Sequence, residues 1–378
     1  QSQWIITMKK TIVICIDGWD SEYLDYRKMN FIESNKSHSF TKIVDSMMPS
    51  VTNVNNISIL TGQYPSKHGI CSNYNYSIET NHGVYLEENR YIQSETIFDI
   101  YSKNDLTTLL ATSKNKLKTL IVNNLNKNTS FSAEKPSKED IIDFGIPPSI
   151  YSIKANSWTI KSAAKKIKEI NPTFAYITLT DYAMHKFHPE SEESMEHLKL
   201  IDEEICNLIE QNMQYEIFIT ADHGMSEKSN LINLEEKLNK FTIKSKAVPI
   251  IKDKHEIHHS NLGGSIYVYL HNSKDINESK KIIQNLKGVD EVLTKSEAFE
   301  NLNLKKEMIG DLIVMGDEDT VFGDIPKSKF PRYLRSHASK HETSIPLVAI
   351  NSHQTSDYFI ENKSIGSYII NSYKTLVE

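Results

Sequence analysis

Three short, apolar segments of this chain each run directly into an aspartate. Residues 11–16 precede Asp17, the segment PTFAYITLTD ends at Asp181, and YEIFITADHG contains Asp222. Nearly continuous apolar runs of this length predict strands of a parallel sheet that is buried on both faces. Residues between the last two segments recur at helical spacing and predict a covering helix: Met195, Leu198, Ile201, Ile205 and Leu208. We therefore expect an α/β fold, a mostly parallel sheet flanked by helices.

The sequence changes in character after about residue 245. SIYVYLHN, ESKKIIQNLKG, VDEVLTKSEAFENLN and DLIVMGDE read in order as a strand, a helix, a strand followed by a helix, and a strand. This order predicts a smaller α+β cap of residues 245–330, inserted into a core of residues 8–244 and 331–378. The end of RSHASKHETSIPLVAI predicts a further core strand, and SIGSYIINSYKTLV predicts a final helix.

The charge and composition of the chain argue against nucleic acid and membranes as its partners. A net charge of −6 over 378 residues gives no electrostatic footprint for nucleic acid, and no apolar run reaches the length of a membrane span. The first ten residues lack the pattern of a secretory signal, and the three cysteines are odd in number and far apart. We therefore expect a cytoplasmic protein with reduced thiols and a small-molecule substrate. The oligomeric state is left open, a homodimer included.

The three aspartates fall where the predicted strands end, which in open α/β sheets is the edge that binds ligands. Histidines accompany them: TDYAMH places His185 four residues after Asp181, ADHG places His223 next to Asp222, and LRSHASKHE contains His337. Neutral imidazole and carboxylate together suit zinc, and manganese or iron are alternatives. Taken singly, each of these motifs can also arise by chance around an aspartate that caps a helix or forms a turn. The whole set, with all its aspartates and histidines in this order at strand ends, is far more specific for a metal centre.

Thr52, in MPSVTNVNNISILTG, follows a Pro-Ser turn at the start of a predicted helix. It is open to two interpretations: an ordinary helix N-cap, or a nucleophile whose hydroxyl is activated beside a metal. Ser50 is the rival nucleophile.

The ordered motifs IDG, MPSVTNVNNISILTG, TDYAMH, TADHGM and RSHASKHE resemble the alkaline phosphatase superfamily, and within it the phosphonoacetate hydrolase family. The resemblance covers most of the chain and implies an alkaline-phosphatase-like core with two zinc ions. It implies that one metal is held by Asp181, His185 and His337, and the other by Asp17, Asp222 and His223 together with the nucleophile Thr52.

The resemblance also implies how substrate binds. Lys114 and Lys116, in TSKNKLK, correspond to a lysine pair that contacts the substrate carboxylate, and Asn73 corresponds to a donor to a phosphonyl oxygen. His337 is also placed against the substrate. Without the resemblance, KNKLK reads as a solvated helix face, and Asn73 could equally be an Asx-turn residue. Ala338 and Ser339 depart from the family pattern, which has glycines after the histidine.

The implied reaction is cleavage of the carbon–phosphorus bond of phosphonoacetate to acetate and phosphate through a phosphothreonine. The alternative is a nucleotide pyrophosphatase/phosphodiesterase of the same superfamily, which needs an aromatic slot for a base. Two further classes are disfavoured. A metal-dependent phosphoglycerate mutase uses serine as its nucleophile and has a longer chain. A non-catalytic binding protein with this fold would not need all six metal ligands and the threonine.

Overall fold

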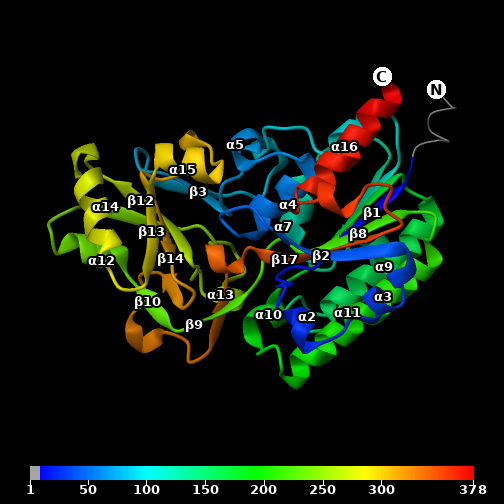
Figure 1. The fold of residues 1–378 in the computed structure, drawn as a ribbon, viewed down its shortest axis with the longest axis horizontal. Coiled ribbons are helices and arrows are strands. Elements are labelled where there is room, and N and C mark those ends of the chain that lie inside the picture. The colour runs from blue at the N-terminus through cyan, green and yellow to red at the C-terminus, as the bar shows by residue number, and fades with distance from the viewer. Residues whose placement is uncertain (1–8) are drawn as a thin grey trace.

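The computed structural model describes residues 9–378, so the predicted start of the core at residue 8 lies outside the described part. The larger lobe is built on a seven-stranded sheet of order β2-β17-β8-β1-β7-β5-β6 (Figure 1). All of its strands except β17 run parallel to one another, as the apolar segments predicted. The strands are β1 (Thr11–Cys15), β2 (Ser39–Asp45), β5 (Thr108–Thr112), β6 (Asn128–Ser132), β7 (Phe174–Thr178), β8 (Glu216–Thr220) and β17 (Ser344–Ile350).

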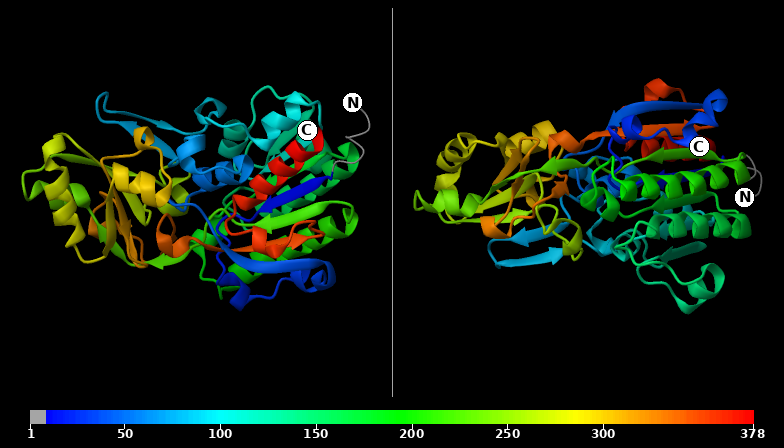
Figure 2. Two further views of the ribbon diagram at one scale, coloured as in Figure 1. Left: turned by 45° about the horizontal axis from the view of Figure 1, so that its top comes forward. Right: turned by 90° about the horizontal axis from the view of Figure 1, so that it is seen from below.

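Helices cover both faces of this sheet. Figure 1 shows α4 and α16 above the strands and α3, α9 and α11 below them, and Figure 2 shows the same layers from two further directions. The central strands β1, β7 and β8 are buried along their whole length, which explains their unbroken apolar composition. The helices are α3 (Asn30–Glu33), α4 (Thr52–Thr61), α9 (Ala155–Ile170), α11 (Glu192–Gln211) and α16 (Ser364–Val377).

The smaller lobe, at the left of Figure 1, contains an antiparallel sheet of order β11-β12-β14-β13. Its strands are β11 (Ser245–Pro249), β12 (Ser265–Leu270), β13 (Val289–Thr294) and β14 (Leu312–Gly316), and its helices include α14 (Ile276–Gln284) and α15 (Lys295–Leu302). One hydrophobic cluster of this lobe also includes Leu234 and Leu238 of α12 (Leu234–Asn239). The boundaries at residues 245 and 330 stay a prediction, and α12 packs with the cap although it precedes residue 245.

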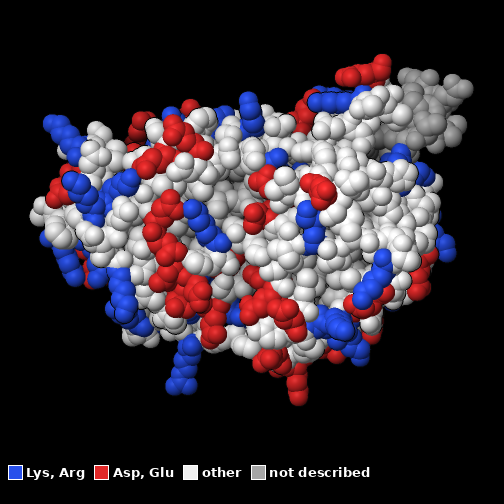
Figure 3. All heavy atoms as spheres, in the orientation of Figure 1, with Lys and Arg blue, Asp and Glu red and all other residues white. Residues whose placement is uncertain are grey.

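The surface is mixed in charge. On the face drawn in Figure 3, lysine and arginine side chains are interspersed with aspartate and glutamate side chains. Within residues 9–378, every helix is too short or too polar to cross a lipid bilayer.

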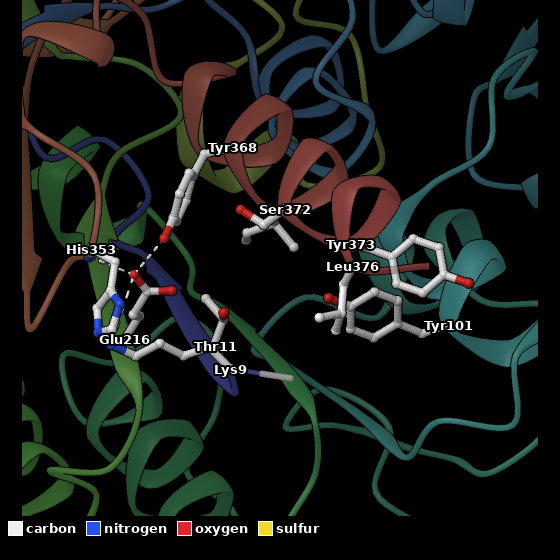
Figure 4. A pocket seen from close by; sticks show the side chains of 10 residues that line it. Lys9, Thr11, Tyr101, Glu216, His353, Tyr368, Ser372, Tyr373 and Leu376 are labelled. Carbon is white, nitrogen blue, oxygen red and sulfur yellow. Dashed lines mark hydrogen bonds and ion pairs between the residues drawn. The ribbon is translucent and has the colours of Figure 1, made fainter. Parts of the chain in front are cut away.

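A small cavity of about 170 Å³ lies at the amino ends of β1 and β8 (Figure 4). Glu216, the first residue of β8, accepts hydrogen bonds there from the Tyr368 hydroxyl (2.6 Å) and the His353 amide (2.7 Å). Because the strands are parallel, this cavity lies at the opposite edge of the sheet from the strand-end aspartates.

Helix α4, which begins at Thr52, is fixed by close packing against α16. Gly366 of α16 lies so near α4 that an added Cβ would stand 1.9 Å from the carbonyl oxygen of Ile59. Only glycine allows this approach, so the position of α4 depends on a residue in the last helix of the chain.

We expect Gly366→Ala to lower the free energy of unfolding by about 2 kcal/mol or more, because the two helix backbones must separate. Urea denaturation followed by circular dichroism measures the change. Thr375→Ala, on an exposed position of the same helix, is the control and should change stability by less than about 0.5 kcal/mol. Equal effects of the two substitutions would contradict this account of the helix contact.

Candidate metal centre

The carboxyl ends of four adjacent strands bring ionisable side chains to one point of the sheet. In the order β8, β1, β7 and β5, the strands are followed by Asp222, Asp17, Asp181 and Lys114. All four side chains are at most 3% exposed. The sequence prediction that the three aspartates share one edge of the sheet is therefore confirmed.

Asp181, His185 and His337 form the first cluster of candidate ligands. His185 lies on α10 (Tyr182–Lys186), and its Nε2 is 2.9 Å from Asp181 Oδ2. His337 follows β16 (Leu334–Ser336), and its Nε2 is 3.5 Å from the same oxygen.

Asp17, Asp222 and His223 form the second cluster. The Nε2 of His223 lies 3.1 Å from Asp17 Oδ1 and 3.5 Å from Asp222 Oδ1. The amides of Gly18 and His223 both donate to Asp222 Oδ1, at 3.1 and 2.9 Å, which fixes that carboxylate. The rings of His223 and His337 stack with centroids 3.5 Å apart, so the two clusters adjoin.

All three candidate imidazole ligands are oriented in the same way. The Nδ1 of His185 contacts the carbonyl oxygen of Arg335 at 2.6 Å, that of His223 contacts Gly224 at 2.8 Å, and that of His337 contacts Ser50 at 2.7 Å. A carbonyl oxygen only accepts, so each Nδ1 carries a hydrogen and each Nε2 faces its cluster, an arrangement typical of metal-binding histidines. Both carboxylate oxygens of Asp17 and the Nε2 of His185 are buried, and their close partners are Lys114 and the other ionisable groups of the clusters. These donors fit two divalent cations, each with oxygen and nitrogen ligands.

The electrostatics of the centre show how much negative charge is concentrated there. Burial and the charge of Asp17 raise the pKa of Asp222 to about 8. Burial and Asp181 would also raise the pKa of Asp17, but Lys114 and His223 outweigh them and hold it at about 2. Burial opposes charge on His223, yet Asp222 and Asp17 raise its pKa to about 9. A divalent cation would take the place of the proton that these carboxylates attract to His223.

The structure places Thr52 beside the second cluster. Its hydroxyl lies 3.3 Å from His223 Nε2, and its side chain is buried. The N-cap interpretation is wrong: Val51 occupies the N-cap position of α4, without a side-chain cap, and Thr52 is the first helical residue. The Ser50 hydroxyl instead donates to the carbonyl oxygen of Ser339 at 2.7 Å, so of the two hydroxyls it is that of Thr52 that contacts the second cluster.

Asn56 is a residue of the centre that the sequence did not reveal. Its Oδ1 accepts hydrogen bonds from the Tyr176 hydroxyl (2.6 Å) and the Thr178 hydroxyl (2.9 Å), and its Nδ2 lies 3.4 Å from Asp222 Oδ2. It therefore ties α4 to β7 and to the second cluster. A sequence signal for Asn56 does exist: three asparagines lie near the start of an otherwise largely apolar helix, and the structure shows that every residue of this helix is buried.

Both predicted substrate lysines are buried, so the interpretation of KNKLK as a solvated helix face is wrong. Lys114 Nζ lies 2.6 Å from Asp17 and 3.6 Å from Asp181, one carboxylate of each cluster. Lys116, on α7 (Asn115–Ile121), lies 2.9 Å from Asp253, a cap residue that the sequence did not single out. The contact of these lysines with substrate stays a prediction.

Asn73 joins α4 to the cap rather than making a local turn. Its Oδ1 accepts a hydrogen bond from the amide of Asn53, in the first turn of α4, and its Nδ2 donates to the carbonyl oxygen of Ile251. Its predicted contact with a phosphonyl oxygen is compatible with this position, next to the amino end of the helix that Thr52 begins.

Two histidines of the cap border the first cluster. His258 and His259 are buried at the end of α13 (Glu256–His259), and His258 Nε2 contacts the Thr180 hydroxyl at 3.1 Å. His341, in contrast, pairs with Asp290 at the surface and belongs to neither cluster, in agreement with the choice of His337 from the sequence.

The departure at Ala338 has a structural consequence. Ala338 is fully buried and adopts a φ of 92°, in the region that favours glycine. Alanine at this φ imposes backbone strain next to His337, whereas glycine, which the resemblance implies at this position, adopts the angle without strain.

Paired carboxylate and imidazole clusters at the carboxyl edge of this sheet, with a threonine hydroxyl beside them, define a hydrolase of the alkaline phosphatase superfamily. A family model described as type I phosphodiesterase / nucleotide pyrophosphatase matches residues 11–343. The chain belongs to this family.

Curated relatives match part of the chain. Bis(5'-adenosyl)-triphosphatase ENPP4 of Bos taurus is 25% identical over 247 residues, and that of Homo sapiens is 26% identical over 249. Each match spans 60% of this chain and 50% of the relative, so the chain matches about half the length of these proteins.

Solved structures match nearly the whole chain. Phosphonoacetate hydrolase from Sinorhizobium meliloti 1021, in complex with phosphonoformate, has a TM-score of 0.89 and 26% identity, and covers 97% of this chain and 96% of its own. The structure of the same enzyme in complex with phosphonoacetate has a TM-score of 0.88, and the match again covers 97% of this chain and 96% of that chain. Murine ENPP5, with a TM-score of 0.72 and 14% identity over 96% of this chain and 94% of its own, shares the fold.

We expect the purified protein, after saturation and removal of loose metal, to retain about two divalent cations per chain. Asp222→Asn should retain about one fewer, because it removes an anionic ligand from the second cluster only. Elemental analysis by mass spectrometry measures the content. Asp290→Asn, at the surface beside His341, is the control and should retain both. Full metal content in Asp222→Asn would contradict the proposed ligand set.

We expect Ala338→Gly to raise the free energy of unfolding by about 1 kcal/mol, because glycine adopts the positive φ without strain. The matched control is Ala349→Gly in β17, where the backbone is extended and the same change should lower stability by up to about 1 kcal/mol. Chemical denaturation of both variants gives the comparison, and a loss of stability in Ala338→Gly would refute the strain.

Proposed function

We propose that this protein hydrolyses the carbon–phosphorus bond of phosphonoacetate to acetate and phosphate, with two zinc ions and Thr52 as nucleophile. The observation that carries the proposal is a pair of buried lysines: Lys114 lies between the metal clusters, and Lys116 lies beside Asp253 of the cap. A substrate with a phosphonate at one end and a carboxylate at the other requires positive charge at both ends. The likeness to a solved phosphonoacetate hydrolase with phosphonoacetate bound supports the same substrate.

Bound divalent cations would favour the ionised Thr52 hydroxyl and neutralise the phosphonate oxygens. Thr52 loses its hydroxyl proton to solvent and its Oγ attacks phosphorus; a P–O bond forms, and the carbon–phosphorus bond breaks with its electron pair on carbon. The charge spreads into the carboxylate as an enolate, which a lysine ammonium stabilises, and a solvent proton completes acetate. Water then cleaves the phosphothreonine, which releases phosphate and restores the hydroxyl.

The residues of this chain position the reaction. Asn56 and the Gly366 contact hold the helix that Thr52 begins, and the amino end of that helix favours negative charge at the reacting oxygens. Lys114, on the turn after β5, lies between the clusters, and cations that compensate its carboxylate partners would leave its ammonium available to substrate. The cytoplasmic location stays a prediction.

A nucleotide phosphodiesterase is the second candidate, favoured by the family model and by one groove. A cavity of about 670 Å³ between the hairpin after Asn73 and the cap is lined by Tyr74 and Tyr76, which a nucleobase could stack on. Phosphate release from phosphonoacetate and nitrophenol release from p-nitrophenyl thymidine 5'-monophosphate discriminate the two. A strong preference for the diester would replace the first candidate by the second.

We expect the metal-loaded protein to release acetate and phosphate from phosphonoacetate in equal amounts, and Thr52→Ala to reduce the rate by about 10³-fold or more because the attacking oxygen is lost. Nuclear magnetic resonance of the products measures both. Ser50→Ala, two residues away, is the control and should keep most of the activity. Undiminished turnover in Thr52→Ala would eliminate the covalent mechanism.

A further inference from the structure

Asp253 lies in the segment between β11 and α13, and its carboxylate reaches from the cap to the core. The Nζ of Lys116 lies 2.9 Å from Asp253 Oδ2, and the two side chains are 2% and 7% exposed. A carboxylate of the protein thus already occupies the position beside Lys116 that the proposed function assigns to the carboxylate of the substrate.

The other oxygen of Asp253 has partners of its own in the cap. Its Oδ1 accepts a hydrogen bond from the amide of His255 at 2.8 Å and lies 3.2 Å from His259 Nε2. Burial alone would raise the pKa of Asp253, but Lys116 and His259 hold it well below its usual range. Asp253 is therefore ionised, and it would keep hydrogen-bond partners if it gave up Lys116.

The same segment is held to the core at a second point. His255 Nε2 lies 3.2 Å from both carboxylate oxygens of Glu134, which follows β6. Asp253 can therefore change its partner while the cap segment stays attached to the core.

The two lysines differ in what can free them. Lys114 is paired with Asp17 and Asp181, which belong to the metal clusters, so divalent cations compensate its partners. Asp253 belongs to neither cluster. Lys116 therefore stays paired in the metal-loaded protein, and a substrate carboxylate must compete with Asp253 for it.

We propose that Asp253 is a built-in anion that holds Lys116 until a substrate carboxylate replaces it, and that it thereby sets how strongly the site selects carboxylate-bearing ligands. The inference rests on the proposed function, which supplies a substrate with a carboxylate. A buried ammonium without a counter-charge is strongly unfavourable, so an exchange of one carboxylate for another keeps the site neutral at each stage. A ligand without a carboxylate leaves the Lys116–Asp253 pair intact.

The test compares two ligands of the metal-loaded full chain by isothermal titration calorimetry. Phosphonoformate has a carboxylate next to its phosphonate, and inorganic phosphate has none. We expect Asp253→Asn, which keeps the shape and removes the competing charge, to raise the preference for phosphonoformate over phosphate about tenfold relative to wild type. An unchanged preference, or an equal change in the affinity for both ligands, would overturn the inference.

Two further variants make the result specific. Lys116→Gln should lower the preference for phosphonoformate, and adding Asp253→Asn to it should produce no gain, because the shared partner is gone. Lys116→Gln alone keeps the inference falsifiable if Asp253→Asn does not fold, because an unchanged preference in Lys116→Gln would overturn it. A full gain in the double variant would overturn the inference.

Asp202→Asn is the matched control. Asp202 is a carboxylate 1% exposed on α11, paired with Arg27 at 3.6 Å and outside both metal clusters. Its loss should leave the ligand preference at the wild-type value, and a gain like that of Asp253→Asn would overturn the inference.

The proposed function and this inference can fail separately. Release of acetate by the wild-type protein tests the function, whereas the ligand preference requires no turnover. Acetate release with an unchanged preference in Asp253→Asn would refute the role of Asp253 alone. A raised preference without acetate release would support the role of Asp253 in binding and refute the proposed reaction.

Discussion

Three buried carboxylates repel one another in this centre, and its structure depends on the nearby cationic groups that compensate this repulsion. Asp222, Asp17 and Asp181 are brought together because parallel strands in register end at the same level of the sheet. Three negative charges at this depth are stable only with cations close by. Three imidazoles with Nε2 turned inward and one ammonium group face them, and the donor atoms divide into two sets that each suit a divalent ion.

The surroundings of the centre serve to keep those groups in place. Backbone carbonyls fix the three imidazoles, and backbone amides fix Asp222. Asn56 anchors the helix that begins with Thr52, and Asn73 connects that helix to the cap. The Thr52 hydroxyl is thus held at the start of a packed helix, which suits the in-line attack on phosphorus that we propose for it.

The sequence predicted the parts of this structure that local pattern determines. Continuous apolar strands that run into aspartates predicted both the parallel sheet and the meeting of Asp17, Asp181 and Asp222. The cap elements were also predicted, because their strands and helices have distinct periodicities. The ligand set as a whole came from an ordered resemblance, since no local pattern assigns His337 to the cluster of Asp181.

Other features could not be predicted because they depend on long-range contacts. Nothing in KDKHEIHH indicates that Asp253 meets Lys116, which is 137 positions away in the sequence. The interpretation of Thr52 as the N-cap was wrong because Val51 holds that position and Thr52 is the next residue. Only the backbone geometry reveals this shift of one residue. The role of Asn56 depends on hydroxyls of β7, and the strain at Ala338 depends on a φ angle that its own type disfavours.

The two lysines after β5 show how one turn can serve two charged regions. Lys114 precedes α7 and faces the metal clusters, whereas Lys116 is within α7 and faces the cap. Side chains two positions apart at the start of a helix point in different directions, so two residues suffice to place positive charge both between the clusters and at the lobe boundary. Because each ammonium already has a carboxylate partner, neither is a simple positive patch. In the binding mode that we propose, an anion enters by exchanging partners, and selectivity then depends on the carboxylates of the protein as much as on the lysines.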